Sequence, residues 1–340
     1  MMPSPLLYSF LDLAPIRAGH TAADSFRETL ALAQLADELG YTRYWLAEHH
    51  NIPGVASAAT SVVIAHVAGG TQRIRVGSGG IMLPNHAPLV IAEQFGTLES
   101  LFPGRIDLGL GRAPGGDQRT ARALRRNLGS SGDTFPQDLA ELRGYLGDPQ
   151  PGQAVHAVPG EGLNVPIYLL GSSDFSARLA AAEGLPFAFA SHFAPDYLLD
   201  AIELYRNGFR PSAQLARPHV MVGINAFLAD TDAEAQRLYT SLQQAFLGII
   251  RGARSQLSPP VETMEGLWLP HERAHVENMT RCSIVGSPET VREQLESLLA
   301  QTQADEIIAT SQIYDPAARQ RCMELFADVV STRNARQRAA

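Results

Sequence analysis

Residues 43–51 read Arg-Tyr-Trp-Leu-Ala-Glu-His-His-Asn, so an aromatic, apolar run is followed at once by three ionisable side chains and an amide. The preceding residues 21–40 have the apolar spacing of a helix and end in glycine, which commonly follows a helix. A helix, a buried strand and then a polar cluster are typical of a β/α barrel, where chemistry lies at the carboxyl ends of the strands. We therefore expect a strand over residues 44–47 with the polar cluster at its end.

The rest of the chain repeats this alternation. Eight short apolar runs are each followed by a helical pattern, and the predicted strands are residues 6–11, 44–47, 74–76, 106–110, 167–170, 187–190, 220–228 and 306–310. Alternating strands and helices predict a parallel sheet, and eight such units predict closure into a (β/α)8 TIM barrel. An open doubly wound sheet is the alternative, but it usually has a Gly-rich first turn, whereas residues 12–15 read Asp-Leu-Ala-Pro.

We expect a single domain over residues 1–340, because α/β barrels of this length commonly form one domain. Residues 251–280 mix Pro, Gly, His and charged residues without a clear period. With a helix predicted at residues 288–302, they indicate an insertion before the eighth strand, and we expect residues 251–280 to be mobile. The polar residues 331–340 are expected to fray.

Composition narrows the class of protein. Apolar residues make up 45% of the chain and charged residues 18%, and the net charge is −8, which argues against a nucleic-acid or anionic-membrane partner. Residues 119–126 hold four arginines, which we interpret as a solvated face. The two cysteines are too few for a disulfide framework or a cysteine zinc cage. No secretory leader or apolar run of about 18 residues is present, so we expect a cytoplasmic protein.

The cluster of Glu48, His49 and His50 admits two interpretations. Successive strand residues point to opposite sides, so Glu48 and His50 share one face and His49 takes the other. One histidine then faces a pocket while the other forms a structural hydrogen bond with Glu48. A metal hydrolase is the alternative, and its further ligands would be Asp12, His86 and His192. We favour a site without a metal ion, because three successive residues cannot converge on one ion in a regular strand.

Other strand ends carry signals for a phosphorylated ligand. Arg112 follows the fourth strand, and its planar fork of donors suits phosphate. Ser172, Ser173 and Ser176 lie where the fifth strand turns into a helix, and helix N-termini bind phosphate well. A surface salt bridge for Arg112 and ordinary helix capping by the serines are the alternatives. The glycine-rich residues 109–116 do not form a dinucleotide fingerprint, because Pro114 falls where the helix should begin.

Four stretches, residues 45–50, 77–84, 103–112 and 285–289, resemble the bacterial luciferase-like flavin monooxygenases, in particular their single-chain, YhbW-type members. The resemblance implies a (β/α)8 barrel that binds reduced FMN, which reacts with O₂ to give a C4a-peroxyflavin. It implies oxygen insertion into a small organic substrate such as an aldehyde, ketone or sulfonate. It also implies a separate flavin reductase as a transient partner, which fits the lack of a nicotinamide fingerprint. Relatives are often homodimers, and the Ala-rich residues 57–68 would suit such an interface.

The resemblance also implies roles for individual residues. His49 matches the catalytic histidine, and a near-neutral pKa would suit proton transfer. Gly79 and Gly80 match a cis peptide beside the flavin ring. The positions that match contacts to the FMN phosphate are Arg112, Ser173 and Ser176, and we add Ser172 from its place at the helix start. His192 and Phe193, at the end of the sixth strand, and the region of Trp268 are our candidates for substrate contact.

The chain also departs from the family pattern. Ser172 stands where luciferase has an acidic residue, and residues 251–280 do not resemble the luciferase lid. We therefore expect no efficient light emission. Two further alternatives stay open: an F420-dependent hydride-transfer oxidoreductase with the same fold, and a non-catalytic flavin-binding protein.

Overall fold

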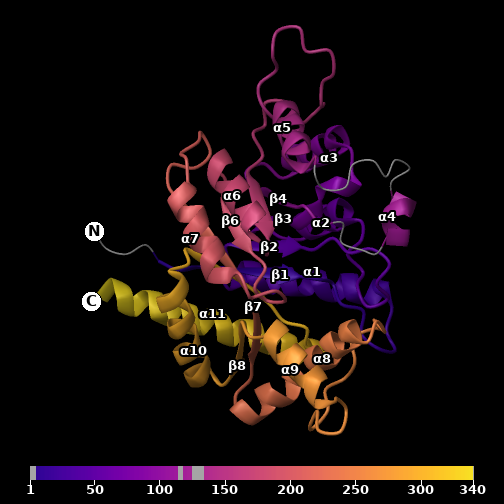
Figure 1. Cartoon of the computed structure of the whole chain (residues 1–340), viewed down its shortest axis with the longest axis vertical. Coiled ribbons are helices and arrows are strands. Elements are labelled where there is room, and N and C mark those ends of the chain that lie inside the picture. Colours follow the sequence, from indigo (N-terminus) through magenta and orange to yellow (C-terminus); the bar gives the residue numbers. More distant parts are fainter. Residues whose placement is uncertain (1–4, 114–117, 125–133, 340) are drawn as a thin grey trace.

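The computed structural model describes residues 5–113, 118–124 and 134–339, and strands alternate with helices along the chain (Figure 1). The strands are β1 (Leu7–Asp12), β2 (Arg43–Leu46), β3 (Arg75–Met82), β4 (Ile106–Gly111), β5 (Ile167–Gly171), β6 (Phe187–Phe189), β7 (Val220–Leu228), β8 (Ser283–Gly286) and β9 (Glu306–Thr310). All pair in parallel in the order β6-β5-β4-β3-β2-β1-β9-β7-β8, and β6 also pairs with β7. Eight strands therefore close into a ring, which confirms the predicted (β/α)8 barrel.

The ninth strand, β8, was not predicted. It pairs with the end of β7, from Asn225 opposite Ser283 to Leu228 opposite Gly286, and lies outside the closed ring. Strand β7 has nine residues and its neighbour β6 has three. The end of β7 therefore extends beyond β6, and β8 pairs with that part. A strand of four residues that is followed directly by a helix is too short to show a period in sequence.

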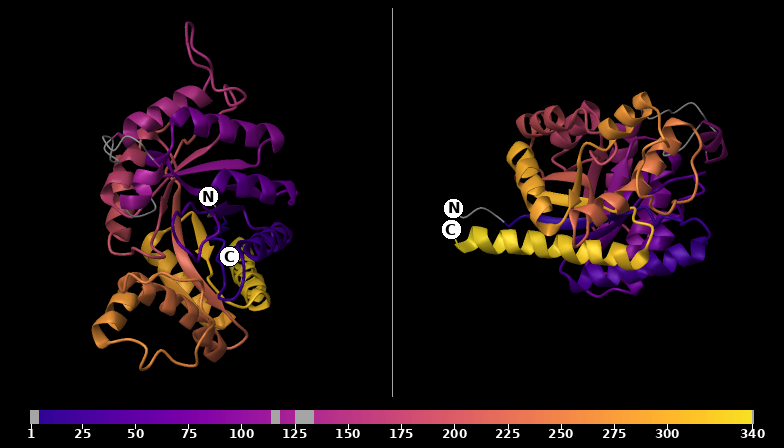
Figure 2. Two further views of the ribbon diagram at one scale, coloured as in Figure 1. Left: turned by 90° about the vertical axis from the view of Figure 1, so that its right-hand side faces the viewer. Right: turned by 90° about the horizontal axis from the view of Figure 1, so that it is seen from below.

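Helices cover the outside of the ring, as both views in Figure 2 show. They are α1 (Ala22–Glu38), α2 (Thr60–Gly69), α3 (Pro88–Leu101), α4 (Gln118–Leu124), α5 (Phe135–Leu146), α6 (Asp174–Glu183), α7 (Leu198–Gly208), α8 (Asp232–Ile250), α9 (Pro270–Met279), α10 (Pro288–Thr302) and α11 (Pro316–Ala339), with a 3₁₀ turn at Leu83–Asn85. The start of α1 follows the sequence: Thr21 and Asp24 form a reciprocal capping box. Part of the arginine patch, residues 125 and 126, lies outside the described residues.

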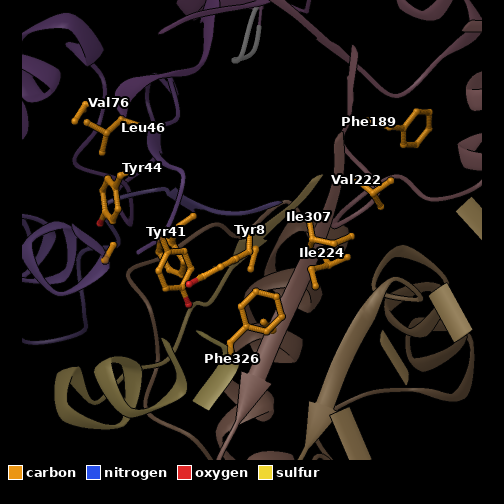
Figure 3. Close-up of a cluster of buried hydrophobic side chains, with 14 of the residues drawn as sticks. Tyr8, Tyr41, Tyr44, Leu46, Val76, Phe189, Val222, Ile224, Ile307 and Phe326 are labelled. Atoms are coloured by element: carbon orange, nitrogen blue, oxygen red, sulfur yellow. The ribbon is translucent and has the colours of Figure 1, made fainter. Parts of the chain in front are cut away.

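The main hydrophobic core lies between the outer faces of the strands and the helices. Outward-facing Tyr44, Leu46 and Val76 belong to it, and Figure 3 shows them with Tyr8 and Tyr41. The rings of Tyr8 and Tyr41 pack edge to face with centroids 4.7 Å apart. Burying side chains of this size stabilises the fold by about 1.5–3 kcal/mol each.

The barrel interior is charged at the amino-terminal ends of the strands. Arg43 on β2 donates from Nε to Glu306 on β9 at 2.7 Å, and from Nη1 to Asp107 on β4 at 2.8 Å. The same Nη1 donates to the Tyr168 hydroxyl on β5 at 2.7 Å, and Trp45 Nε1 donates to Asp107 at 3.1 Å. This network joins four strands across the interior.

Two expectations about the second half of the chain need correction. Residues 251–280 are not wholly irregular, because they contain α9, whose buried residues are only Glu272 and Val276. The polar tail is helical, since α11 continues to Ala339, and the fraying of its end stays a prediction. The Asn334 side chain holds this helix to the start of β1, with two hydrogen bonds of 3.0 Å to the backbone of Leu6. The mobility of residues 251–280 stays a prediction.

Candidate active site

Glu48 is a buried anchor just past the end of β2. It accepts hydrogen bonds from His50 Nε2 at 2.8 Å, from His86 Nε2 at 2.9 Å and from the Met82 amide at 2.9 Å. Burial alone would raise the pKa of Glu48, but the hydrogen bond and charge of His86, with the bond from His50, lower it below its ordinary value. The predicted structural pair of Glu48 with one histidine is confirmed, and that histidine is His50. The bonds from the Met82 amide and His86 tie the segment after β2 to the end of β3 and the turn that follows it.

The His49 ring lies within electrostatic range of Glu48, His50 and Arg254. Its Nδ1 is buried and has no hydrogen-bond partner among the described residues. Burial, and then the positive charge of Arg254, lower the pKa of His49 to about 4. The prediction of a near-neutral pKa is therefore wrong for the protein alone, because the sequence shows neither the burial nor the approach of Arg254. At neutral pH His49 is an uncharged imidazole with one nitrogen available to a ligand.

His192 lies within electrostatic range of His49. Burial, and then the charge of His49, lower the pKa of His192 to about 4, and its Nδ1 is also buried with no partner within the residues that the structure describes. The ring packs on β7 at Gly223, where an added Cβ would lie 2.6 Å from Nδ1. Asn225 on the same strand donates to the His192 carbonyl at 2.7 Å. The structure thus brings together two of the histidines selected from the sequence.

Phe193 and Trp268 are placed differently. The Phe193 ring lies edge-on to His192 with centroids 4.9 Å apart, but the side chain is 45% exposed. Trp268 lines a separate cavity of about 710 Å³ between α8 and residues 262–277, and none of His49, His192 and Phe193 lines it. This cavity therefore does not connect Trp268 with the two histidines.

The glycines at the end of β3 allow close approach of neighbouring chains. The peptide bond between Gly79 and Gly80 is cis, which confirms the expectation. A Cβ on Gly79 would lie 2.7 Å from Leu11 Cδ1, and one on Gly80 would lie 2.7 Å from the Gly109 carbonyl oxygen. A side chain on Gly80 would push β3 away from the backbone of β4, whereas one on Gly79 would first displace the Leu11 side chain.

Arg112 and the serines meet at the adjacent ends of β4 and β5. The Arg112 guanidinium lies over the ring of Phe175, 4.2 Å from its centroid, and Phe175 belongs to the first turn of α6. Ser173 is the N-cap residue of α6, yet its side chain makes no capping hydrogen bond. The Ser173 hydroxyl therefore does not cap the helix in the ordinary way. Ser176 packs on Gly171, where an added Cβ would lie 2.3 Å from the serine Oγ. A guanidinium, a hydroxyl that makes no capping bond and a helix N-terminus together fit a phosphate group.

The candidate ligands of a metal hydrolase do not converge. Asp12 accepts from Arg319 Nη2 at 2.7 Å and from the Tyr44 hydroxyl at 2.6 Å, whereas His86 is bound to Glu48. Among the described residues, no group of three or more His, Cys, Asp or Glu side chains is arranged to hold a metal ion. Within the same residues, no helix is long and apolar enough to cross a membrane.

Comparison with known proteins identifies the family. Residues 8–306 match the family model described as luciferase-like monooxygenase. The chain belongs to the luciferase-like monooxygenase family. It is 58% identical to the Bacillus subtilis (strain 168) protein YvbT over 330 residues, covering 96% of this chain and 97% of that one. It is 53% identical to the Escherichia coli (strain K12) luciferase-like monooxygenase over 329 residues, covering 97% and 98%.

A solved structure supports the same assignment. The crystal structure of apo-MsnO8 superposes with a TM-score of 0.89 at 36% identity, covering 96% of this chain and 98% of that one. The luciferase-like family resemblance and the prediction of a flavin-dependent monooxygenase are thereby confirmed at the level of the family.

Two polar residues near the mouth were missed in the sequence. Thr310, the last residue of β9, is buried, and its Oγ1 has no hydrogen-bond partner among the described residues. Its position at the carboxyl end of a strand, where barrel enzymes place their functional groups, could have identified it from the sequence. Arg254, whose charge acts on His49, lies in the insertion, where no period marked any residue.

Proposed function

We propose that this luciferase-like monooxygenase uses reduced FMN and O₂ to insert one oxygen atom into a small organic substrate of the aldehyde, ketone or sulfonate type. The observation that carries the proposal is the corner between β4 and α6, where Arg112 and the uncapped Ser173 hydroxyl meet a helix N-terminus. When bound, the reduced flavin supplies the two electrons that activate O₂. The protein's task is then to hold, orient and shield the reacting groups.

In this proposal the phosphate lies at that corner. Arg112 balances its charge, and Ser172, Ser173 and Ser176 donate hydrogen bonds with the first amides of α6. Gly79 and Gly80 lie beside the flavin ring, because a chain without side chains lets a flat ring approach. The fold supports this placement, since the ends of β3, β4 and β5 are neighbours on the ring.

His49 is the proposed catalytic residue. Its imidazole is uncharged at neutral pH and its Nδ1 has no partner in the described part of the chain, so it can accept a proton from, or donate a hydrogen bond to, a group at the mouth. An anion bound nearby would raise the pKa of His49 toward neutrality, because an opposite charge favours the protonated ring. His192 and Phe193 are proposed to contact the substrate on the β6 side.

The test uses the full-length protein with photoreduced FMN, a panel of aldehydes, ketones and sulfonates, and measurement of both oxygen uptake and oxygenated product. We expect a product with at least one class, and loss of that product in His49→Ala. Tight FMN binding with no substrate-dependent product from any class would contradict the proposal. A parallel titration with FMN, reduced FMN and F420 separates the flavin from the deazaflavin alternative, because F420 has a long anionic tail that needs extra basic contacts.

Two partners complete the proposal. A separate flavin reductase supplies reduced FMN by transient contact. A second copy of the chain forms a homodimer through α2, whose Val62 is 67% exposed. Sedimentation of the native protein and of Val62→Glu tests the dimer: we expect the native protein at twice the monomer mass and the variant as a monomer.

A further inference from the structure

Residues 251–257, the start of the insertion, are held against the loops that follow β1 and β2. The Leu257 amide donates to the Ile16 carbonyl at 2.9 Å, in the loop after β1. In the loop after β2, a Cβ added to Gly54 would lie 2.3 Å from the Ser255 carbonyl oxygen. Both loops leave the carboxyl ends of their strands, so the start of the insertion lies at the barrel mouth.

Arg254 lies within this segment. Its side chain is exposed and makes no hydrogen bond or ion pair with any described residue. Three residues earlier, Arg251 donates to Glu272 from both Nε and Nη2 at 2.7 Å. Arg251 therefore holds the insertion to α9, whereas no contact of this kind accounts for Arg254.

The charge of Arg254 acts on His49. After burial, it is the largest influence on the pKa of His49, and it exceeds the influence of Glu48, the preceding residue in the chain. Within the described part of the chain, Glu48 is the only carboxylate that contributes to this pKa, and it is already bound by His50 and His86. The positive charge of Arg254 is therefore not balanced at the place where the reacting groups are proposed to meet.

An apolar surface lies at the same side of the mouth. The smaller of the two hydrophobic clusters lies inside the barrel and includes Leu11, Trp45 and Ala47. Leu13, just past the end of β1, packs against this cluster and is partly exposed. A ligand that combines a negative group with an apolar part suits an unpaired guanidinium beside such a surface.

We propose that the substrate is a small organic anion whose carboxylate or sulfonate group is bound by Arg254. The inference rests on the oxygenation proposed above and narrows its substrate class. The planar guanidinium donates two parallel hydrogen bonds to such a group. Arg254 is then a specificity-determining residue, because it holds the anion so that the rest of the substrate lies near His49.

The test is isothermal titration of the full-length protein, saturated with oxidised FMN, at low ionic strength. The ligands are hexanoate, pentane-1-sulfonate and hexanamide. We expect both anions to bind at least about tenfold more tightly than hexanamide, because the amide keeps the chain and loses a charge-assisted hydrogen bond. The preference should shrink at about 0.5 M NaCl, since salt screens an exposed cation.

Substitutions locate the anion. Arg254→Gln should remove the preference for the anions, while the affinities for hexanamide and FMN stay unchanged. Arg254→Lys keeps the charge without the planar fork and should retain part of the preference. The matched control is Arg217→Gln, which should change none of these affinities. Arg217 is exposed just before β7, at the opposite end of the barrel, and forms no ion pair with any residue that the structure describes.

Histidine NMR gives a second readout. The charges that act on His49 are those of Arg254, Glu48 and His50, and His192 lies in range as well. Removing the charge of Arg254, or binding an anion to it, raises the pKa of His49, because a nearby cation disfavours the protonated ring. Arg254→Gln and saturation with hexanoate should therefore each move the titration of His49 to higher pH.

Three results would overturn the proposal. One is hexanamide binding to the native protein as tightly as the two anions. The second is an unchanged preference in Arg254→Gln, which would place the anion elsewhere. The third is a loss of FMN affinity in Arg254→Gln with anion binding intact, which would assign Arg254 to the flavin. The titrations are repeated without FMN and measure binding alone, so a failure of flavin binding or of oxygenation is distinguished from a failure of this inference.

Discussion

Replacing Glu306 by glutamine tests the charged network inside the barrel. Glu306 is fully buried on β9 and is held by Arg43 on β2 and by His219 just before β7. Burial alone would raise the pKa of Glu306, but the charge of Arg43 and the hydrogen bonds from His219 and Arg43 lower it from 4.5 to about 2. The folded state therefore favours the charged form more than the unfolded chain does.

The size of the effect follows from that difference in pKa. At about 1.4 kcal/mol per pKa unit, the ionised side chain contributes about 3 kcal/mol to stability at pH 7. Because the folded-state pKa is the lower one, the contribution is complete above the unfolded value of 4.5 and is lost as the pH falls toward 2. At pH 3 about 1 kcal/mol should remain. Breaking a buried ion pair costs about 3–5 kcal/mol in other proteins, which agrees with the value at pH 7.

The assay is urea unfolding of the native protein and Glu306→Gln at pH 7 and pH 3, followed by circular dichroism. We expect a loss of about 3 kcal/mol at pH 7 that shrinks by about 2 kcal/mol at pH 3. Glu324→Gln is the control, because Glu324 forms an exposed ion pair with Arg321 and should cost less than about 1 kcal/mol. Equal losses at the two pH values would refute the reasoning, because they would show that the charge of Glu306 is not what stabilises the barrel.

Three other substitutions test the site. His49→Ala should lower turnover by about 10²- to 10⁴-fold while FMN affinity, measured by fluorescence titration, stays unchanged; a normal rate would remove His49 from catalysis. Glu48→Ala leaves three partly buried donors without their acceptor and should cost about 1–3 kcal/mol in urea unfolding; a cost near zero would show that the anchor does not hold the turn after β3. Gly80→Ala should cost about 1–3 kcal/mol because its Cβ would lie 2.7 Å from a carbonyl oxygen. Gly144→Ala, with no atom within 4 Å, should not destabilise the protein, and equal losses in the two variants would contradict the steric argument.

The barrel could be predicted because its signals are local. Each strand of the closed ring is a short apolar run, and each is followed by a helix with an apolar face or small buried residues. The pairing of Glu48 with His50 also followed, since alternate side chains along an extended chain share a face.

What could not be predicted depends on contacts between distant residues. The end of α11 is polar in sequence, and it is held at the start of β1 through Asn334 and Leu6, 328 residues apart. The low pKa of His49 depends on burial and on Arg254 in the insertion, and neither is visible in residues 43–51. Strand β8 pairs with the part of β7 that extends beyond β6. Its formation therefore depends on the sheet and cannot be recognised from residues 283–286 alone.

The most direct test of the central claim compares the affinities of FMN and riboflavin for the native protein and for a variant with both Arg112→Met and Ser173→Ala. Two charge-assisted hydrogen bonds to phosphate are worth about 3–6 kcal/mol together, so the native protein should bind FMN at least about 100-fold more tightly than riboflavin. In the variant this preference should fall by at least about 100-fold, with Ser172, Ser176 and the first amides of α6 still in place, while riboflavin affinity is kept. Equal binding of the two flavins by the native protein, or an unchanged preference in the variant, would contradict the placement of the phosphate between β4 and α6.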